Sequence, residues 1–188
     1  MTAYLKGEAC QTIYLDYQNV LNSTNAKIPF GICQIGKAFR NEITPGHFLF
    51  RQREFEQWDL QWFTNPKEMD KWYEYWKAER MQWYQSLVNH KDRLRFRQHD
   101  QNELAHYAKK AVDIEYKFEF ADQEAFKELE GIHDRGDWDL SRHQKFSGQS
   151  MTVRDEAGKE FIPKIVETSG GVDRATLAFL MDAYTEID

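Results

Sequence analysis

Cysteine and long apolar runs are scarce in this sequence of 188 residues. The two cysteines, Cys10 and Cys33, are too few for a disulfide framework, and neither belongs to a CxxC pair that would bind structural zinc. The apolar runs fall far short of the roughly 20 residues that span a bilayer, and the first residues lack the basic and apolar stretches of a secretory signal. We therefore expect a cytoplasmic protein with no membrane partner.

An excess of positive charge is also missing, because the net charge is -6 at pH 7. This balance argues against a general nucleic-acid binder, since phosphate contacts require clustered lysine and arginine. Hydrophobic residues at 41% can form one sizeable core, and the absence of repeats favours a single domain over residues 1–188. We interpret the one basic cluster as a solvated charged turn; it consists of Lys91, Arg93, Arg95 and Arg97.

Residues 28–63 predict two strands joined by a loop. Residues 28–42 fit the first strand, and Pro45 and Gly46 mark the loop. Residues 53–63 then alternate with a period of two. One face carries the bulky apolar side chains that require packing, Trp58, Leu60 and Trp62. The opposite face should meet water or line a cleft, and its members are Phe55, Gln57, Asp59, Gln61 and Phe63.

A helical segment is expected over residues 66–90. Asn65 can cap this helix, Pro66 suits its first position and Glu68 can close a capping box. Apolar residues recur along it at helical spacing, and we interpret them as packing residues and not as a cofactor site: Met69, Trp72, Trp76, Trp83 and Leu87.

The second half of the chain predicts further strands and a final helix. We expect a short helix over 102–109, strands over 112–120, 128–132 and 161–169, and irregular structure over 134–148. In the final helix, over 172–184, one face should carry Val172, Thr176, Phe179, Leu180 and Ala183. Several strands with a helix packed across them predict an α+β fold with an antiparallel sheet flanked by helices.

Charged residues at the ends of these elements suggest an anion site. Arg40 and Glu42 share a strand face, as do Glu167 and Ser169, and Arg174 lies in the first turn of the final helix. Helix N-termini and arginines both attract anions, so Arg40 and Arg174 could hold nucleotide phosphates from two sides. Surface ion pairs would use the same residue types, so spacing alone leaves both interpretations open. A metal ion or an ammonium group could be held by the carboxylates Glu8, Asp59, Glu128 and Glu167.

Several segments, in order along almost the whole chain, resemble the glycyl-tRNA synthetases of class II. Phe39-Arg40-Asn41-Glu42 and Arg53-Glu54-Phe55-Glu56-Gln57 look like motif 2, which would cover about residues 37–63. Gly170-Gly171-Val172-Asp173-Arg174 looks like motif 3, which would cover about residues 161–184. Further similar segments lie at 30–42, 105–109, 128–132 and 137–140.

The resemblance implies an enzyme that activates glycine with ATP and Mg²⁺ and transfers it to tRNA(Gly), as a homodimer. Arg40 would contact the α-phosphate, and Arg51 and Arg174 would hold the terminal phosphates of a bent ATP. Phe55 would stack on adenine, with Glu42 near the base or the amino acid. The ATP site would also include Glu128, Mg²⁺ would be held by Glu128 and Glu167, and glycine would be bound by Glu8, Asp59, Glu167 and Ser169.

The sequence also departs from this family. Asp59 and Gln61 occupy positions that are usually Glu, and residues 5–9 replace a common Leu-Arg-Pro-Glu-Thr. We expect motif 1 and the anticodon-binding domain to be absent, which predicts a fragment or a free-standing relative with impaired charging. The alternative function is a synthetase-like module that binds a nucleotide or a protein partner without charging tRNA, and a third is an inert structural fragment. The histidines lack ligand spacing and are interpreted as structural: His106, His133 and His143.

Overall fold

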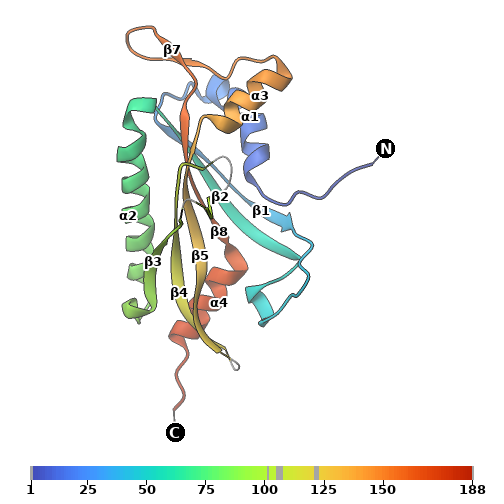
Figure 1. Ribbon diagram of the computed structural model, residues 1–188, viewed down its shortest axis with the longest axis vertical. Coiled ribbons are helices and arrows are strands. Elements are labelled where there is room, and N and C mark those ends of the chain that lie inside the picture. Colours follow the sequence, from blue (N-terminus) through green and yellow to red (C-terminus); the bar gives the residue numbers. More distant parts are fainter. Residues whose placement is uncertain (1, 101, 105–107, 121–122, 188) are drawn as a thin grey trace.

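The fold is built on one six-stranded antiparallel sheet (Figure 1). The computed structural model describes residues 2–100, 102–104, 108–120 and 123–187. The strand order is β1-β2-β8-β5-β4-β3, and every neighbouring pair is antiparallel. The predicted α+β class is therefore confirmed. From one edge to the other, the strands are β1 (Phe30–Phe39), β2 (Glu54–Thr64), β8 (Lys164–Gly171), β5 (Gln123–Gly136), β4 (Lys110–Phe120) and β3 (Leu94–Gln98).

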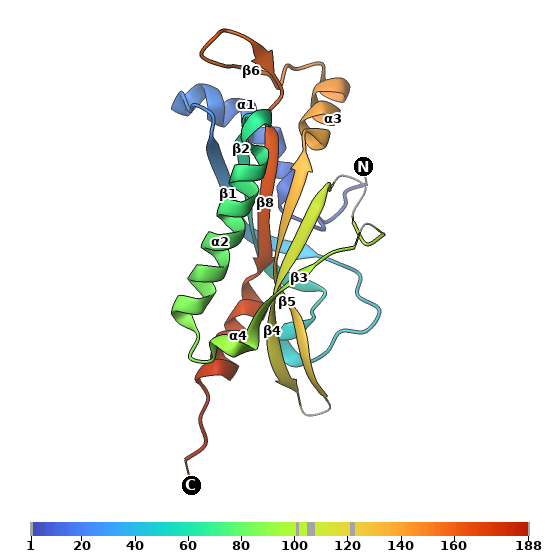
Figure 2. The ribbon, with the colours of Figure 1, turned by 60° about the vertical axis from the view of Figure 1, so that its left-hand side comes forward.

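Helices cover the two faces of the sheet unequally (Figures 1 and 2). α2 (Met69–Leu87) and α4 (Val172–Ala183) pack on one face. α1 (Cys10–Thr24) and α3 (Trp138–Ser147) meet at one end of the other face, beside a small hairpin of β6 (Val153–Arg154) and β7 (Glu160–Phe161). None of the helices in the described residues packs on the rest of that second face. No helix in the described ranges is long and apolar enough to cross a membrane.

Each covered region has its own apolar core. Trp58 and Trp62 of β2 pack on the α2 side, where Trp62 contacts the rings of Trp72 and Trp76. Tyr17 of α1 packs against other aromatic rings on the opposite side, in a second cluster with Cys10, Ile13, Tyr14, Phe63, Leu140, Met151 and Ile165. The tryptophans of β2 are packed against a helix as predicted, whereas Gln61 and Phe63 on its other face are fully buried and neither meet water nor line a cleft.

The start of the long helical segment is as predicted. The Asn65 side chain accepts a hydrogen bond from the Lys67 amide at 3.0 Å, and Pro66 opens a short 3-10 turn, η2 (Pro66–Glu68), that leads into α2. Glu68 pairs with Lys71 at 3.1 Å instead of closing a capping box. Of the predicted packing stripe, Met69, Trp72 and Trp76 contact the core, whereas Trp83 and Leu87 are 40% and 52% exposed.

Two expectations for the later half are wrong. Residues 134–148 are not irregular, because β5 continues to Gly136 and α3 follows; Gly148 ends that helix in the left-handed conformation that glycine adopts readily. In α4 the buried residues are Ala175, Ala178 and Asp182, while Leu180 of the predicted face is 61% exposed. The sequence pattern missed this face because its members are small or charged.

The expectations for residues 91–109 also need correction. The basic cluster forms the turn η3 (Lys91–Arg93) followed by the edge strand β3, and its arginines are paired with carboxylates on neighbouring segments, in Arg93–Glu119, Arg95–Glu115 and Arg97–Glu103. The short helix expected over 102–109 is not found where the chain is described, since 102–104 form a turn and 108–109 are not helical; residues 105–107 lie outside the described ranges. The helix α1 was not predicted at all.

Asp182 links α4 by hydrogen bonds to the connection between α2 and β3. This buried carboxylate accepts hydrogen bonds from the amides of Asn89 and His90 and, at 3.2 Å, from the Tyr116 hydroxyl. Burial alone would raise the pKa of Asp182, but these donors outweigh burial and lower it. A carboxyl with a lowered folded pKa stabilises the fold above its unfolded pKa of about 3.9, and that stability is lost as the pH falls through the folded pKa.

We expect Asp182→Ala to lower the free energy of unfolding by about 3 kcal/mol at pH 7, because several buried donors lose their acceptor. Urea denaturation should show this loss and should show it shrinking below about pH 4. Asp70→Ala is the control, since Asp70 is 83% exposed and forms a surface ion pair with the Lys110 side chain. An equal effect of both variants would contradict the role given to Asp182.

Candidate active site

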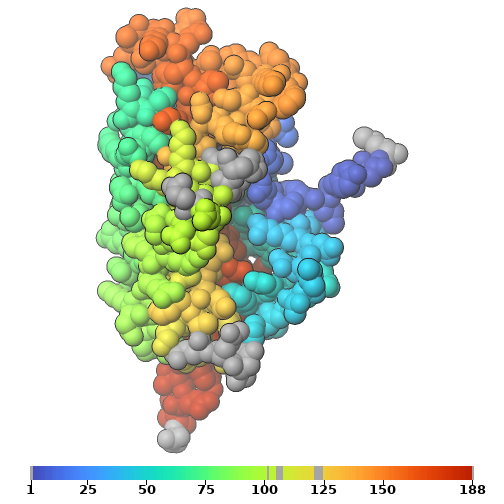
Figure 3. All heavy atoms as spheres, in the orientation of Figure 1, coloured from blue at the N-terminus to red at the C-terminus, as the bar shows by residue number. Residues whose placement is uncertain are grey.

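A pocket opens on the sheet face that α2 and α4 leave free. In Figure 3 it is the hollow between the segment around residues 40–55 and the strand β5, with atoms of the C-terminal segment at its base. All ten site residues proposed from the sequence lie on the lining of this pocket: Glu8, Arg40, Glu42, Arg51, Phe55, Asp59, Glu128, Glu167, Ser169 and Arg174. Their individual roles remain predictions.

Strand register builds the floor of the pocket. Gln61 of β2 lies opposite Glu167 of β8, which in turn lies opposite His133 of β5. In the next row, Asp59 lies opposite Ser169. Because side chains two residues apart on a strand share a face, these rows place several polar groups side by side on one surface.

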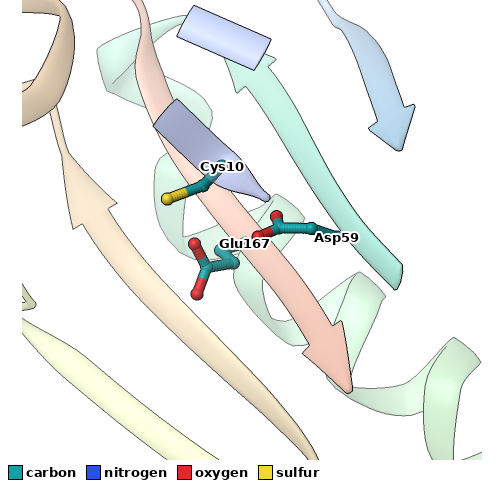
Figure 4. A group of neighbouring side chains, drawn as sticks. All are labelled: Cys10, Asp59 and Glu167. Atoms are coloured by element: carbon teal, nitrogen blue, oxygen red, sulfur yellow. The ribbon is translucent and has the colours of Figure 1, made fainter. Parts of the chain in front are cut away.

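One half of the pocket is acidic and buried. Asp59 is 1% exposed and Glu167 is 4% exposed. Figure 4 shows the side chains of Asp59 and Glu167 next to one another on β2 and β8, with the thiol of Cys10 close by on α1. One ligand atom from each of these three residues lies within 4.8 Å of the others. Cys10 itself donates a hydrogen bond from its Sγ to Glu8 Oε1 at 3.1 Å.

Glu167 is held by donors on several sides. Arg135 Nη1 donates to Glu167 Oε2 at 2.6 Å, and Ser169 Oγ donates to Oε1 at 3.3 Å. His133 Nδ1 lies 3.2 Å from the same Oε1. Burial alone would raise the pKa of Glu167, but His133 and Arg135 outweigh burial and lower it. Glu167 is therefore an ionised carboxylate in the folded chain.

The pKa of Asp59 is shifted in the opposite direction from that of Glu167. Burial and the neighbouring charge of Glu167 raise the pKa of Asp59 well above its usual value, and the hydrogen bond from Gln61 only partly offsets them. Arg135 is shared, because its Nε and Nη2 also donate to Asp139 at 2.9 and 3.1 Å. One buried arginine thus faces three buried carboxyl groups, so this half of the pocket favours a further positive charge.

An ammonium group suits this charge better than a metal ion does. The carboxylate oxygens of Asp59 and Glu167 already accept from Gln61, and those of Glu167 also accept from Arg135 and Ser169. A metal ion would need several of these oxygens at short distances and would have to displace the donors. An ammonium group needs only its own three hydrogen bonds.

The other half of the pocket is basic. Arg174 Nη1 donates to the Glu128 carbonyl at 2.8 Å, and its guanidinium lies 4.4 Å from the centre of the Phe50 ring. Burial and the nearby charges of Arg51 and Arg40 lower the pKa of Arg174, although the carboxylate of Glu128 acts against them. Arg40 donates to the Gly7 carbonyl at 3.1 Å and lies 5.3 Å from the centre of the Phe55 ring. Three arginines that repel one another around a pocket favour a polyanion.

Two residues of the site were not identified from the sequence. His133 was interpreted as structural and not as a metal ligand, and the structure places it on the pocket lining beside Glu167. Gly131 was the sequence signal for this position of His133. A Cβ at Gly131 would lie 2.5 Å from His133 Cε1, so the glycine leaves room for the imidazole. Arg135 lay in a segment that was expected to be irregular. His143 does not line the pocket, and its Nε2 lies 3.1 Å from Gln11 Oε1; His106 lies outside the described residues.

Comparison with known proteins gives a consistent result. The family model described as tRNA synthetase class II core domain (G, H, P, S and T) matches residues 2–184. The glycine–tRNA ligase of Thermobifida fusca is 52% identical over 185 residues, which cover 98% of this chain and 40% of that protein. The proteins of the same name from Borrelia hermsii and Treponema pallidum are each 49% identical, over 96% and 97% of this chain and 41% and 40% of their own lengths. The chain thus spans about two fifths of the length of the curated relatives it matches.

Proposed function

The chain belongs to the family of class II tRNA synthetase core domains, and we propose that it forms the site at which a glycine–tRNA ligase activates glycine with ATP. In this proposal the hairpin of β1 and β2 contains motif 2, and motif 3 spans β8 and α4. Transfer to tRNA(Gly), homodimer formation and a cytoplasmic location are proposed for the whole protein, on the resemblance of its motifs and on the names of its relatives.

One observation carries the proposal: a buried acidic half and an arginine-lined half share a single pocket. Glycine carries an ammonium group and a carboxylate two bonds apart, and ATP carries a triphosphate. The ammonium group would enter the acidic half, beside Asp59 and Glu167. The glycine carboxylate would then point toward Arg40, where the α-phosphate is expected.

In the reaction, a carboxylate oxygen of glycine attacks the α-phosphorus of ATP. A new O–P bond forms while the bond to the bridging oxygen of pyrophosphate breaks, and pyrophosphate leaves. Arg40 would stabilise the negative charge that develops on the α-phosphate, and Arg51 and Arg174 would hold the terminal phosphates. Phe55 would stack on adenine, with Glu42 nearby. Protein groups act by position and charge, so no nucleophilic side chain is required.

Mg²⁺ is proposed on the family's use of ATP. The Glu128 side chain is 52% exposed and has one loose ion pair, to Arg174 at 3.6 Å, so its oxygens can accept a hard cation. The oxygens of Glu167 already accept hydrogen bonds from Gln61, Arg135 and Ser169. The contacts therefore favour Glu128 over Glu167 as a ligand. When bound, Mg²⁺ would neutralise part of the triphosphate charge.

Glycine-dependent exchange of pyrophosphate into ATP tests the proposal on this chain. We expect exchange with glycine and none with alanine or without an amino acid. Calorimetry with ATP and with glycine, each alone, accompanies the assay. ATP binding without exchange would instead support a synthetase-like nucleotide-binding module, and absence of binding to either ligand would contradict both functions.

We expect Asp59→Asn to weaken glycine binding by about tenfold or more and ATP binding by less than about twofold, because only the ammonium group uses this negative charge. In the parent, glycine affinity should rise with pH across the range in which Asp59 loses its raised-pKa proton, since the ammonium group requires the ionised carboxylate. Calorimetry from pH 5 to pH 9 measures both effects.

Asp113→Asn is a matched control for this prediction. Asp113 is a buried carboxyl on β4 that is bound by His99 and does not line the pocket. The control should bind both ligands as the parent does. Equal losses of glycine and ATP in Asp59→Asn would show that Asp59 has a general structural role instead.

A further inference from the structure

The carboxamide of Gln61 joins the two carboxylates of the acidic half. Gln61 is fully buried, and its Nε2 donates one hydrogen bond to Asp59 Oδ1 and another, at 2.7 Å, to Glu167 Oε2. Both protons of the amide are therefore used. Two carboxylates this close repel one another, and a shared donor between them offsets that repulsion.

Tyr14 of α1 holds this amide in place. The hydroxyl of Tyr14 donates to Gln61 Oε1 at 2.6 Å. Tyr14 is itself fully buried and packs in the cluster of α1, β2 and α3. If the amide were flipped, its oxygen would face two carboxylates and its Nε2 would face the Tyr14 hydroxyl. The hydroxyl could accept from that Nε2, but the carboxylates cannot donate to the oxygen, so the two acids select the orientation and Tyr14 holds the amide in it by donating to Oε1.

We propose that Gln61, held in place by Tyr14, is a positioning residue that holds Asp59 and Glu167 together as the acceptor for the substrate ammonium group. This inference rests on the proposed function, because it assigns the source of selectivity in the same pocket. Gln61 lies behind the carboxylates and is not itself among the residues that line the pocket. It therefore acts through them.

Loss of the amide has two physical consequences. The carboxylates are no longer linked, so an arriving ammonium group must itself hold them at the right separation. In addition, Asp59 binds its proton more tightly, since the hydrogen bond from Gln61 favours its charged form. An ammonium group then competes with a more firmly held proton. The other charged groups around the network are Glu8, Glu167, Arg135, Asp139 and His133.

Two variants separate this role from simple packing. Gln61→Met keeps the length and volume of the side chain but removes both donors. Tyr14→Phe keeps the ring and removes only the hydroxyl that holds the amide in place. Tyr17→Phe is the matched control, because Tyr17 is a buried tyrosine on the same helix whose hydroxyl has no hydrogen-bond partner among the described residues.

Calorimetry with glycine and with ATP is the first measurement. We expect Gln61→Met to weaken glycine binding about tenfold and Tyr14→Phe about threefold, with ATP binding within about twofold of the parent in both. Tyr17→Phe should bind both ligands as the parent does. Unchanged glycine binding in both test variants, or parallel losses of glycine and ATP, would overturn the inference while leaving the proposed function intact.

Carboxyl ¹³C NMR titration is the second measurement and requires no ligand. The signal of Asp59, identified by its loss in Asp59→Asn, should titrate at higher pH in Gln61→Met and, by less, in Tyr14→Phe, and should not move in Tyr17→Phe. If the parent binds no glycine, the proposed function fails and the titration alone decides: a raised midpoint supports the network and an unchanged one overturns it. If Gln61→Met does not fold, as judged by circular dichroism, Tyr14→Phe decides.

Discussion

Replacement of Arg40 by alanine should slow glycine-dependent pyrophosphate exchange by roughly a hundredfold or more. The Arg40 guanidinium lines the pocket and is not engaged by a carboxylate in the described contacts, where its Nε donates to the Gly7 carbonyl, so it can bind the α-phosphate. Removal of one such preorganised donor typically raises a barrier by about 3 kcal/mol. Folding should survive, because Arg40 is exposed.

Lys37→Ala provides the matched control for this prediction. Lys37 is an exposed cation on β1, three residues before Arg40; it pairs with Glu54 at 3.3 Å and does not line the pocket. Arg40→Lys adds a second comparison, because lysine keeps the charge but loses the planar fork that binds a phosphate through two bonds. We expect Lys37→Ala to keep the parental rate and Arg40→Lys to recover only part of it. Exchange at the parental rate in Arg40→Ala would remove Arg40 from the reaction centre.

The sequence predicted those parts of the fold whose signals are local. The alternation over residues 53–63 predicted β2 nearly to its ends, and Asn65 with Pro66 predicted where the helical segment begins. The order of the motifs then identified ten residues that the structure brings to one pocket. Six of these residues lie on strands or on α4, where a period or a cap gives a local signal. The other four lie outside the helices and strands, and the resemblance of their segments, not a period or a cap, identified them: Glu8, Arg40, Glu42 and Arg51.

The parts that the sequence did not predict depend on distant contacts. In α4 a buried face of alanines and Asp182 has no apolar pattern, because Asp182 is buried for its hydrogen bonds to the segment around Asn89. Burial on the polar face of β2 also depends on distant contacts. Gln61 was expected to meet water or line a cleft, yet it is fully buried because Tyr14, 47 positions away, supplies a donor. A residue pattern cannot show that a polar side chain will find such partners.

Arg135 is the most consequential residue that the sequence analysis missed, and Arg135→Met should lower the free energy of unfolding by about 3–5 kcal/mol at pH 7.5. Its guanidinium is 2% exposed and contacts both Asp139 and Glu167, so a methionine of similar length would leave two buried carboxylates without their cation.

In the parent, the contact with Arg135 helps to lower the folded pKa of Glu167. In the variant, this cation no longer offsets burial, so the folded pKa of Glu167 should rise above its unfolded value of about 4. A carboxyl with a raised folded pKa destabilises the fold as the pH rises above the unfolded pKa, and this loss is recovered as the pH falls. The difference in free energy of unfolding between variant and parent should therefore shrink toward pH 4.

Urea denaturation at pH 7.5, 6 and 4.5 measures this trend, with Arg154→Met as the matched control. Arg154 forms an ion pair with Glu160 in the β6–β7 hairpin, but its side chain is 72% exposed, so the control should change stability by no more than about 0.5 kcal/mol at any pH. Arg135→Met should also weaken glycine binding, because a protonated carboxyl attracts an ammonium group less than a carboxylate does. A stability loss that stays constant with pH would mean that methionine disturbs packing alone, and that Arg135 does not set the charge of the pocket.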